Sequence, residues 1–489
     1  MKLAEVLKGI NVASSTATGR EEITGITYNS KRVGPGFLFS ALRGVNSDGL
    51  DFAGEAATRG ASAVLSDRPN VNAVTGPVWI QVTDSREALA LASANFYEHP
   101  STRFKVVGVT GTKGKTTVTY ILEEILKTCG ASVGVIGTIE YRFAGIRRPA
   151  GRTTPEAPDL QSTMKEMADS GVSHCLIEVS SHALDQKRVW GTGFDVAVFT
   201  NLSGEHLDYH PTMEDYFEAK KKLFFLDHKR NASVVNMDDQ WGRKLISELP
   251  MKTVTFGFEP AAIVRALKFN MSEKGMELQV QYPGGVMNIE TSLLGRHNVY
   301  NILAAASAAL SLNVPAGEII KGLSSLRGVP GRFEKVENDR GLLLVVDYAH
   351  TDNALENLLI TAREFKPRRI ILVFGAGGGR DKFKRERMGR VASRLADWTI
   401  LTSDNPRNED PLEIITGIET GFKKEASGAY EKIPDRREAI ARAIEIAGPG
   451  DAVLVAGKGH EDYQIFKDKT IHFSDAEVIR ELLGEVHKG

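Results

Sequence analysis

The chain has 489 residues, of which 42% are hydrophobic and 25% are charged, as expected for a globular protein of about three domains with well-filled cores. Lys plus Arg number 61 and Asp plus Glu number 62, which excludes a global basic field for nucleic acid or an anionic membrane and leaves only local anion sites. The two cysteines stand apart, no cleavable leader pattern opens the chain, and no run approaches the roughly 18 apolar residues of a membrane span, so we expect a cytoplasmic protein without disulfides, zinc or a membrane span.

Residues 1–102 predict a small N-terminal α/β domain. They combine short apolar segments with Gly-rich turns, and the first ten residues, MKLAEVLKGI, predict an amphipathic helix. A polar, Pro-containing stretch at 99–104 precedes a stronger pattern. We therefore place the first domain boundary there.

Residues 103–332 predict a central domain with a mostly parallel sheet. β-branched apolar runs alternate with amphipathic helical patterns, which is typical of a doubly wound fold. The predicted strands are 105–110, 132–138, 174–180, 194–202 and 232–237, and the predicted helices include 116–130 and 159–171.

Residues 333–489 predict a third α/β unit with strands at 341–350, 368–378, 397–406 and 451–459. Its glycine cluster, GAGGGR, ends on Arg380 where the dinucleotide-binding pattern requires Gly. The sequence therefore argues against an NAD-binding site, and Arg380 taken alone is compatible with surface charge.

A phosphate-binding loop is the strongest local pattern. The predicted strand 105–110 runs through TGTKGKTT into a helix, whose free backbone N–H groups and dipole attract phosphate. Gly111 and Gly114 allow close backbone approach, Lys115 supplies charge to the outer phosphates, and the Thr116 hydroxyl is a magnesium ligand in such loops. The loop is a variant, because the general pattern requires Gly where Val109 stands.

A carboxylate and an imidazole follow two predicted strands. Glu178 ends one strand and His206 follows the next, and open α/β sheets bind ligands at these ends. We expect the two strand ends to be adjacent, so that Glu178 and His206 could hold a second divalent ion near the γ-phosphate. Lys220 belongs to a predicted helix, and by residue pattern alone it is one member of a solvated basic run, Lys220 to Lys222.

Eight blocks in order resemble the Mur ligase family, and they span all three predicted domains. They are TGTKGKTT, EVSSHAL, NLSGEHLDYH, GRHNVYN, PGRFE, DYAHT, SDNPR and AGKGHED. Within the family the blocks are most similar to the ligases that add the third residue of the peptidoglycan stem peptide. The resemblance implies an N-terminal UDP-binding domain, a central P-loop ATPase-type domain and a C-terminal Rossmann-like domain.

The resemblance also implies an ATP-dependent reaction through an acyl-phosphate. ATP would phosphorylate the D-glutamyl carboxylate of UDP-MurNAc-L-Ala-D-Glu, and the amine of an incoming amino acid would displace phosphate. Two Mg²⁺ ions are implied, with Thr116, Glu178, His206 and a CO₂-derived carbamate on Lys220 as ligands. Lys115, Lys220, Glu178 and His206 are then the catalytic residues. The resemblance therefore implies that Lys220 is a carbamylated metal ligand, and not one member of a solvated basic run.

The remaining site residues are carried over in the same way. ATP would be bound by Gly111, Thr112, Lys113, Gly114, Lys115, Thr116, Thr117, His297, Asn301, Arg332 and Asp347. The UDP precursor would be bound by Ser30, Asn46, Ser47, Thr153, Thr154, Ser180, Gln186 and Arg188. The amino acid would be bound by Arg380, Asp404, Asn405, Pro406, Arg407, Gly457 and Glu461.

The block DNPR favours meso-diaminopimelate as the amino acid. This substrate has a second carboxylate that an arginine fork binds bidentately, and lysine-adding relatives lack the arginine of this block. The alternatives are a lysine-adding ligase, a folylpolyglutamate synthase, which has Gly where Thr116 stands, and a non-catalytic nucleotide-binding protein, which would lack the metal ligands. A monomer acting only on small molecules is expected.

Overall fold

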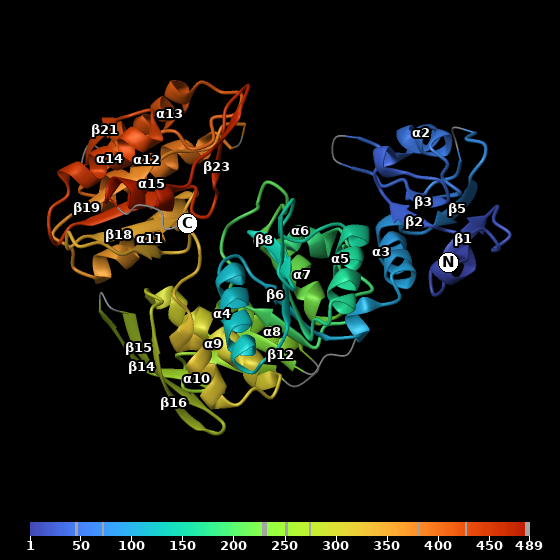
Figure 1. Ribbon diagram of the computed structural model, residues 1–489, viewed down its shortest axis with the longest axis horizontal. Helices are drawn as coiled ribbons and strands as arrows, with labels where there is room; N and C mark the ends of the chain where they lie inside the picture. Colours follow the sequence, from blue (N-terminus) through green and yellow to red (C-terminus); the bar gives the residue numbers. More distant parts are fainter. Residues whose placement is uncertain are drawn as a thin grey trace. The chain divides into compact units, whose positions relative to one another are not determined.

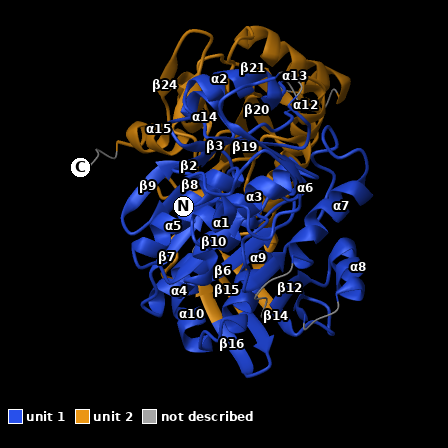
Figure 2. Ribbon diagram, turned by 90° about the vertical axis from the view of Figure 1, so that its right-hand side faces the viewer, with its two compact units in different colours: residues 1–267, 279–288, 300–323 blue, residues 268–278, 289–299, 324–489 orange. Residues whose placement is uncertain are grey.

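The computed structural model describes residues 1–44, 47–70, 73–226, 232–249, 253–272, 275–379, 381–425 and 428–484. The chain divides into two compact units, coloured separately in Figure 2. Unit 1 comprises residues 1–267, 279–288 and 300–323, and unit 2 comprises residues 268–278, 289–299 and 324–489. None of the helices in these described ranges is long and apolar enough to cross a membrane.

The N-terminal part of unit 1 is a small α/β region, as predicted, and its sheet has five strands. The strand order is β1-β5-β4-β3-β2, parallel except for β1. Its elements are α1 (Leu3–Val6), β1 (Val12–Ser15), β2 (Gly25–Thr27), β3 (Phe37–Ser40), α2 (Ala53–Thr58), β4 (Ala63–Ser66), β5 (Val78–Val82) and α3 (Ser85–Phe96), with 3-10 turns at Ser30–Arg32, Gly49–Phe52 and Pro100–Thr102. The predicted first helix exists but has only four residues, of which Leu3 and Val6 are buried.

The central part of unit 1 contains the predicted parallel strands and helices (Figure 1). In chain order the elements of this part are β6 (Lys105–Thr110), α4 (Lys115–Thr128), β7 (Val133–Ile136), α5 (Ala157–Asp169), β10 (His174–Glu178), α6 (Ser181–Asp185), β11 (Val196–Phe199), α7 (Met213–Lys221), β12 (Ala232–Asn236), α8 (Gln240–Glu248) and β13 (Thr253–Gly257), with a 3-10 turn at Lys222–Phe224. Of these, α6, α8 and β13 were not predicted. β7, β10, β6, β11, β12 and β13 are consecutive, parallel neighbours.

Six strands of this sheet were not predicted, namely β13 and the five that follow here. The short hairpin β8 (Glu140–Phe143) and β9 (Ile146–Pro149) adds antiparallel strands to one edge of the sheet. At the other edge lie β14 (Val264–Ser272), β15 (Gly275–Tyr282) and β16 (Gly285–Thr291), so the complete sheet has 11 strands. β15 and β16 alternate buried and more exposed residues along much of their length, as a sheet with one solvated face does.

One predicted neighbour relation is wrong. β10 and β11 are not adjacent, because β6 lies between them and pairs in parallel with both. The strand order therefore reverses direction around β6, which is the topological switch point where open α/β sheets bind ligands. Sequence patterns predict the strands, but their order in space depends on which side of β6 each crossover helix packs.

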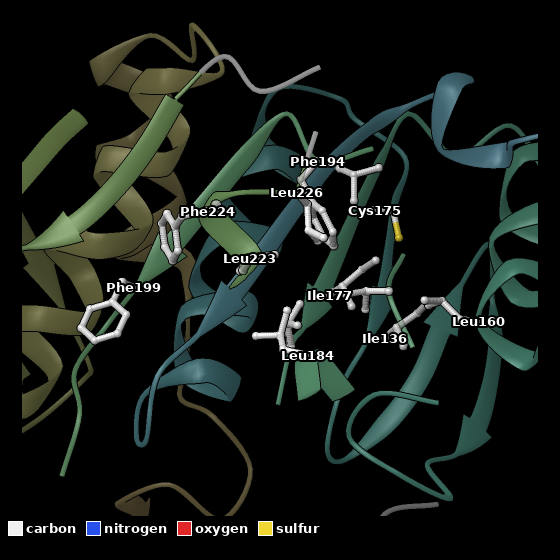
Figure 3. Close-up of a cluster of buried hydrophobic side chains, with 14 of the residues drawn as sticks. Ile136, Leu160, Cys175, Ile177, Leu184, Phe194, Phe199, Leu223, Phe224 and Leu226 are labelled. Carbon is white, nitrogen blue, oxygen red and sulfur yellow. The ribbon is translucent and has the colours of Figure 1, made fainter. Parts of the chain in front are cut away.

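The central core lies under one face of this sheet (Figure 3). Side chains from β10 and β11, such as Cys175, Ile177 and Phe199, pack against Leu160 of α5 and Leu223 and Phe224 of the turn after α7. Helix α4 contacts β6, β7 and β10. Because every residue of β6 after Lys105 is buried, the strand leading into the phosphate loop is held on both faces.

The C-terminal part of unit 2 is an α/β sheet, as predicted, but it has six strands, of which β17 and β21 were not predicted. Its order is β17-β18-β22-β19-β20-β21, parallel except for β17. Its strands are β17 (Glu334–Val336), β18 (Leu343–Asp347), β19 (Ile370–Phe374), β20 (Trp398–Leu401), β21 (Ala429–Lys432) and β22 (Ala452–Ala456), followed by the hairpin β23 (Tyr463–Ile465) and β24 (Thr470–His472).

Helices cover both faces of this sheet. α11 (Asp352–Glu364), α12 (Phe383–Leu395) and α13 (Pro411–Glu425) share one core, and α14 (Arg436–Ile446) and α15 (Asp475–Leu482) share the other. Two more helices, α9 (Arg296–Ser311) and α10 (Ala316–Ser325), precede this part of the chain. The domain boundaries at 102/103 and 332/333 stay a prediction, because the division into compact units follows different limits.

Candidate active site

The phosphate loop joins β6 to the N-terminus of α4. Gly111 and Gly114 have φ of +144° and +88°, conformations that favour glycine. A Cβ on Gly114 would lie 2.4 Å from Asn301 Oδ1, so the loop and Asn301 are in close contact. The amides of Thr112 and Lys113 donate to the backbone and side-chain oxygens of Asn201, at 2.9 and 3.0 Å. The loop is thereby fixed to the segment that follows β11.

Lys115 and Thr116 form the first turn of α4. The Lys115 ammonium donates to the carbonyls of Gly111 and Thr112, at 2.9 and 3.0 Å. The Thr116 hydroxyl donates to Glu178 Oε2 at 2.9 Å, and Thr117 is buried behind it. The charge and the hydroxyl thus lie where free helix N–H groups attract phosphate.

Glu178 is the last residue of β10 and is buried. Besides Thr116, it accepts hydrogen bonds from the backbone N–H and the hydroxyl of Thr138, at 3.0 and 2.8 Å. Gly137 is required here, because a Cβ would lie 2.3 Å from Glu178 Oε1. Thr138, which follows β7, was not singled out from the sequence, although a hydroxyl directly after a strand is a usable signal.

Lys220 is buried, and its interpretation as a solvated residue is wrong. Its side chain is 1% exposed, its ammonium donates to Gly111 O at 2.9 Å, and Nζ lies 4.6 Å from the centre of the Tyr216 ring. Burial, and then the charge of Lys115, hold the pKa of Lys220 well below its ordinary value. This favours a neutral amine beside the phosphate loop.

His206 lies in an aromatic cluster that also contains Tyr216. Its ring centre is 5.1 Å from that of His182 and 5.9 Å from that of Tyr216, whose hydroxyl is 3.2 Å from Thr112 Oγ1. Desolvation by the surrounding protein atoms, followed by the charge of Lys115, lowers the pKa of His206 to about 4, although the residue keeps an exposed surface. The imidazole is neutral near pH 7 and can offer a lone pair. Tyr216, one turn before Lys220, was not identified from the sequence.

No group of three or more His, Cys, Asp or Glu side chains in the described ranges is arranged to hold a metal ion. The ligand set expected from the resemblance is of a different kind, with one carboxylate, one imidazole, one hydroxyl and one modified lysine. The Thr116–Glu178 contact brings two of these four groups together.

Predicted precursor-binding residues gather around the end of β10. Thr154 Oγ1 donates to Glu178 O at 2.7 Å and accepts from Ser180 N at 3.0 Å, and the Thr153 and Thr138 hydroxyls are 3.1 Å apart. Arg188 donates to Thr154 O at 3.0 Å and to Gln186 Oε1 at 2.6 Å. These five predicted residues therefore form one connected group next to the phosphate loop.

In the N-terminal sheet region, Ser30 donates to Glu55 Oε2 at 2.6 Å, and Ser47 O accepts from Gly44 N at 2.9 Å. Asn46 lies outside the described residues. Of the remaining predicted ATP residues, Asn301 belongs to unit 1, whereas His297, Arg332 and Asp347 belong to unit 2. Asp347 accepts from the amides of Phe333 and Ala349, and the Arg332 guanidinium lies over the Tyr348 ring at 5.0 Å.

The predicted amino-acid site lies in unit 2 after β20 and β22. Asp404 and Asn405 are buried, and Asn405 Nδ2 donates to Glu461 Oε2 at 2.8 Å. Arg407 has a φ of +53° and donates from NH1 to Gly378 O at 2.8 Å. Arg380 lies outside the described residues. Pro406 is buried next to Arg407, and a Cβ on Gly457 would lie 2.8 Å from Asp404 Oδ2.

Lys458 was missed within the block AGKGHED. Its side chain is completely buried, and Nζ donates to Glu461 Oε2 at 3.3 Å and to the Tyr463 carbonyl. Glu461 is therefore held from two sides, by Asn405 and by Lys458.

Family models match three successive segments of the chain. These are the Mur ligase family catalytic domain over residues 22–97, the Mur ligase middle domain over 109–309, and the Mur ligase glutamate ligase domain over 331–459.

Several curated proteins match over their full length. Proteins named UDP-N-acetylmuramoyl-L-alanyl-D-glutamate–2,6-diaminopimelate ligase are 43% identical in Solibacter usitatus, covering 99% of this chain and 98% of the relative, and 44% identical in Geobacter metallireducens, covering 98% of each. A solved structure with the same name is 31% identical, covers 99% of both chains and has a TM-score of 0.72. A MurF ligase from Thermotoga maritima in complex with ADP, at 23% identity, 94% and 97% coverage and a TM-score of 0.62, shares the fold.

Proposed function

The chain belongs to the Mur ligase family, and we propose that it joins meso-2,6-diaminopimelate to UDP-N-acetylmuramoyl-L-alanyl-D-glutamate in peptidoglycan precursor synthesis. ATP is consumed, and ADP and phosphate are released. The observation that carries this function is full-length similarity at 41–44% identity to enzymes of that name, together with Arg407 in the block DNPR. The lysine-adding alternative is not favoured.

The phosphate loop supports phosphoryl transfer by positioning and charge, which is most of what this reaction requires from a protein. Gly111 to Thr117 would cradle ATP at the N-terminus of α4, with Lys115 facing the outer phosphates. Mg²⁺, held by Thr116 and Glu178 and by His206 with a modified Lys220, would neutralise charge that develops on the transferred phosphoryl group. The hydroxyl and carboxylate oxygens are ligands that Mg²⁺ prefers.

The burial of Lys220 supports its modification by CO₂. A neutral lysine amine is the form that reacts with CO₂, and its pKa is well below the ordinary value here. Carbamylation would convert this buried amine beside Lys115 into an anionic oxygen ligand. The buried position also shields the carbamate from bulk water.

The group around Thr154 and Arg188 would hold the muramoyl dipeptide with its D-glutamyl carboxylate facing the loop. Ser30, Asn46 and Ser47 would contact the uridine side. His297, Asn301, Arg332 and Asp347 would contact adenine, ribose and phosphates of ATP. These assignments rest on the resemblance and on the hydrogen bonds already described for unit 1.

For the amino acid, Arg407 would bind the distal carboxylate of diaminopimelate, and Glu461 would face the distal ammonium. The hydrogen bond from Arg407 to Gly378 and those from Asn405 and Lys458 to Glu461 fix both charged groups. Arg380 would complete the pocket, with Asp404, Pro406 and Gly457 shaping its floor. We further propose domain boundaries at 102/103 and 332/333, a monomeric enzyme and a cytoplasmic location, where its nucleotide-linked substrates are made.

The test is a panel of amino acids with ATP and the UDP-dipeptide, in which phosphate release and product mass are measured. Strong preference for meso-diaminopimelate over L-lysine is expected. Arg407→Ala should raise the KM for diaminopimelate by the equivalent of about 2–5 kcal/mol, because it leaves a carboxylate unpaired, while the KM for ATP stays constant. Arg437→Ala, in the same unit but on the exposed side of α14, is the control. Equal use of lysine by the unmodified enzyme would refute the assigned substrate.

A further inference from the structure

Three arginines converge on one buried carboxylate in unit 1. Glu156 precedes α5, and its side chain is 7% exposed. Its Oε1 lies 3.0 Å from Arg188 Nε and accepts a hydrogen bond from Arg152 NH1, and its Oε2 lies 3.7 Å from Arg86 NH1. Arg86 comes from the first turn of α3, so the cluster joins the N-terminal sheet region to the central sheet region.

The positive charges of this cluster are not balanced. Three guanidinium groups face one carboxylate, and the nearby Asp159 is bound by Arg32 and by the Tyr28 hydroxyl, each at 3.0 Å. Burial lowers the pKa of Arg188, and the charges of Arg152 and Arg86 lower it further while Glu156 raises it. An excess of partly buried positive charge destabilises the folded protein unless an anion pairs with it.

The hydrogen-bonding capacity of the cluster is also incomplete. Arg86 NH1 is a buried nitrogen without a hydrogen-bond partner in the described structure, since 3.7 Å from Glu156 is too long for such a bond. Arg152 keeps half of its side chain exposed beside Thr153. Arg188 Nε also lacks a hydrogen-bond partner in the described structure, but it lies 3.0 Å from Glu156 Oε1, and NH1 and NH2 of Arg188 donate to Thr154 and Gln186. Arg86 and Arg152 are therefore the members of the cluster whose terminal nitrogens have capacity for a ligand.

The position of the cluster identifies the kind of ligand. Arg152 directly precedes Thr153 and Thr154 in the chain, and Arg188 is bonded to Thr154, so the cluster borders the proposed dipeptide site. Arg86 NH2 also donates to Arg43 O at 3.4 Å, at the start of the loop that contains Ser47 on the proposed uridine side. An anion at this junction lies between the two ends of the UDP precursor.

We infer that Arg86 and Arg152, oriented by Glu156, form an anion subsite for the UDP precursor in addition to Arg188. The inference rests on the proposed function and extends it. Two anionic groups of that substrate fit the chemistry, a carboxylate of the dipeptide and the diphosphate of UDP. Guanidinium groups bind both bidentately. Glu156 is a positioning residue, since it contacts the arginines and not the ligand.

The experiment measures equilibrium binding without ATP, by titration calorimetry, to UDP-MurNAc-L-Ala-D-Glu, UDP-MurNAc-L-Ala and UDP. Arg86→Ala and Arg152→Ala should each weaken binding of the full precursor by roughly tenfold, the effect of losing one charge-assisted hydrogen bond. If the substitutions weaken binding of UDP-MurNAc-L-Ala-D-Glu alone, the subsite binds a carboxylate of the dipeptide. If they weaken binding of UDP to the same extent, the subsite binds the diphosphate. In turnover, the KM for the precursor should rise while kcat and the KM for ATP stay within about twofold.

Arg148→Ala is the matched control, because Arg148 is similarly exposed, lies four residues before Arg152, and contacts Glu166 and the Phe143 ring rather than Glu156. Thermal unfolding midpoints of all variants separate a loss of folding from a loss of binding, and Arg86→Lys retains charge if Arg86→Ala is unstable. If Arg86 and Arg152 variants that fold normally bind the precursor as tightly as Arg148→Ala does, the subsite does not exist. If the unmodified protein fails to bind the UDP-dipeptide, the proposed function itself is wrong.

Discussion

Three consecutive lysines at the end of α7 occupy three different environments. Lys220 is buried against Gly111 and Tyr216, Lys221 pairs with Glu218 and Glu248 at 2.7 and 2.9 Å, and Lys222 pairs with Asp185 at 2.9 Å. One turn of helix is enough to separate a buried position from exposed ones. Only Lys220 is placed to take part in chemistry at the phosphate loop.

Lys220→Ala should therefore lower turnover by about a hundredfold or more, because it removes a charged group proposed to act in the transition state. Lys221→Ala and Lys222→Ala should change stability by only about 0.5 kcal/mol. The measurement is turnover of the three variants with and without formate or acetate, which should partly restore Lys220→Ala by replacing the carbamate. Intact mass reports the modification directly. Equal activity of all three variants would show that Lys220 has no catalytic role.

At the scale of an element, the two glycines that flank α4 have similar backbone conformations but different surroundings. Gly114 before the helix and Gly130 after it have φ of +88° and +73°, so an added side chain is strained at both. Nothing lies within 4 Å of a Cβ on Gly130, whereas a Cβ on Gly114 would meet Asn301 Oδ1 at 2.4 Å. A side chain would therefore strain the backbone at both glycines, but it would clash with a neighbouring residue only at Gly114 in the phosphate loop.

Gly130→Ala should cost about 1 kcal/mol of stability and leave ATP binding unchanged. Gly114→Ala should have a similar backbone cost and also displace Asn301, so ATP affinity should fall at least about tenfold. Nucleotide titration and denaturant unfolding of the two variants separate the effects. If both variants bind ATP equally well, Gly114 serves only to terminate the turn.

Helices α14 and α15 are joined by one buried and one exposed ion pair. The buried Arg436 donates to Asp475 through two hydrogen bonds of 2.7 Å, and Arg437 pairs with Glu481 at 2.7 Å with both side chains about half exposed. Asp475→Ala should cost about 3–5 kcal/mol, because it leaves a buried guanidinium unpaired. Glu481→Ala should cost at most about 1 kcal/mol. Denaturant unfolding measures both, and comparable losses would contradict the assigned difference in burial.

At the scale of the whole molecule, periodicity and turn residues predicted the strands and helices that surround the site. The phosphate loop and Glu178 at its strand end followed from local patterns, because their chemistry depends on neighbours in the chain. The placement of β6 between β10 and β11 and the burial of Lys220 could not be predicted in this way, because each depends on packing between segments far apart in the sequence. The strands β14 to β16 follow one another in the chain and are neighbours in the sheet, so local alternation was a usable signal that was missed. Lys220 was assigned to the active site from the resemblance to the family, because the local sequence pattern alone indicated a solvated lysine.

Acid stability is a property of the whole molecule that the histidines should dominate. Burial lowers the pKa of four of them, namely His174, His182, His210 and His460, and it does so to about 4 for His460. A group whose folded pKa is lowered contributes stability above its unfolded pKa of about 6.5 and loses it as pH falls toward the folded value. The unfolded chain binds more protons in this range, so stability should fall from pH 6.5 to 4. Carboxylates such as Glu409, whose pKa Arg385 lowers to about 2, lose their contribution only at lower pH.

His460→Asn should therefore flatten the dependence of stability on pH between 6.5 and 4 by up to about one proton, since it removes a group that titrates only on unfolding. His472→Asn is the control of opposite sign, because a hydrogen bond to Glu477 raises the pKa of His472. Its contribution is present below pH 6.5 and is lost as pH rises through its folded pKa, so its removal should not flatten the acid slope. Urea unfolding at pH 7.5, 6.5, 5.5 and 4.5, chosen to bracket the ordinary histidine pKa, gives the slope for each variant. An unmodified protein whose stability is constant over this range would show that these imidazoles are accessible to protons in the folded state.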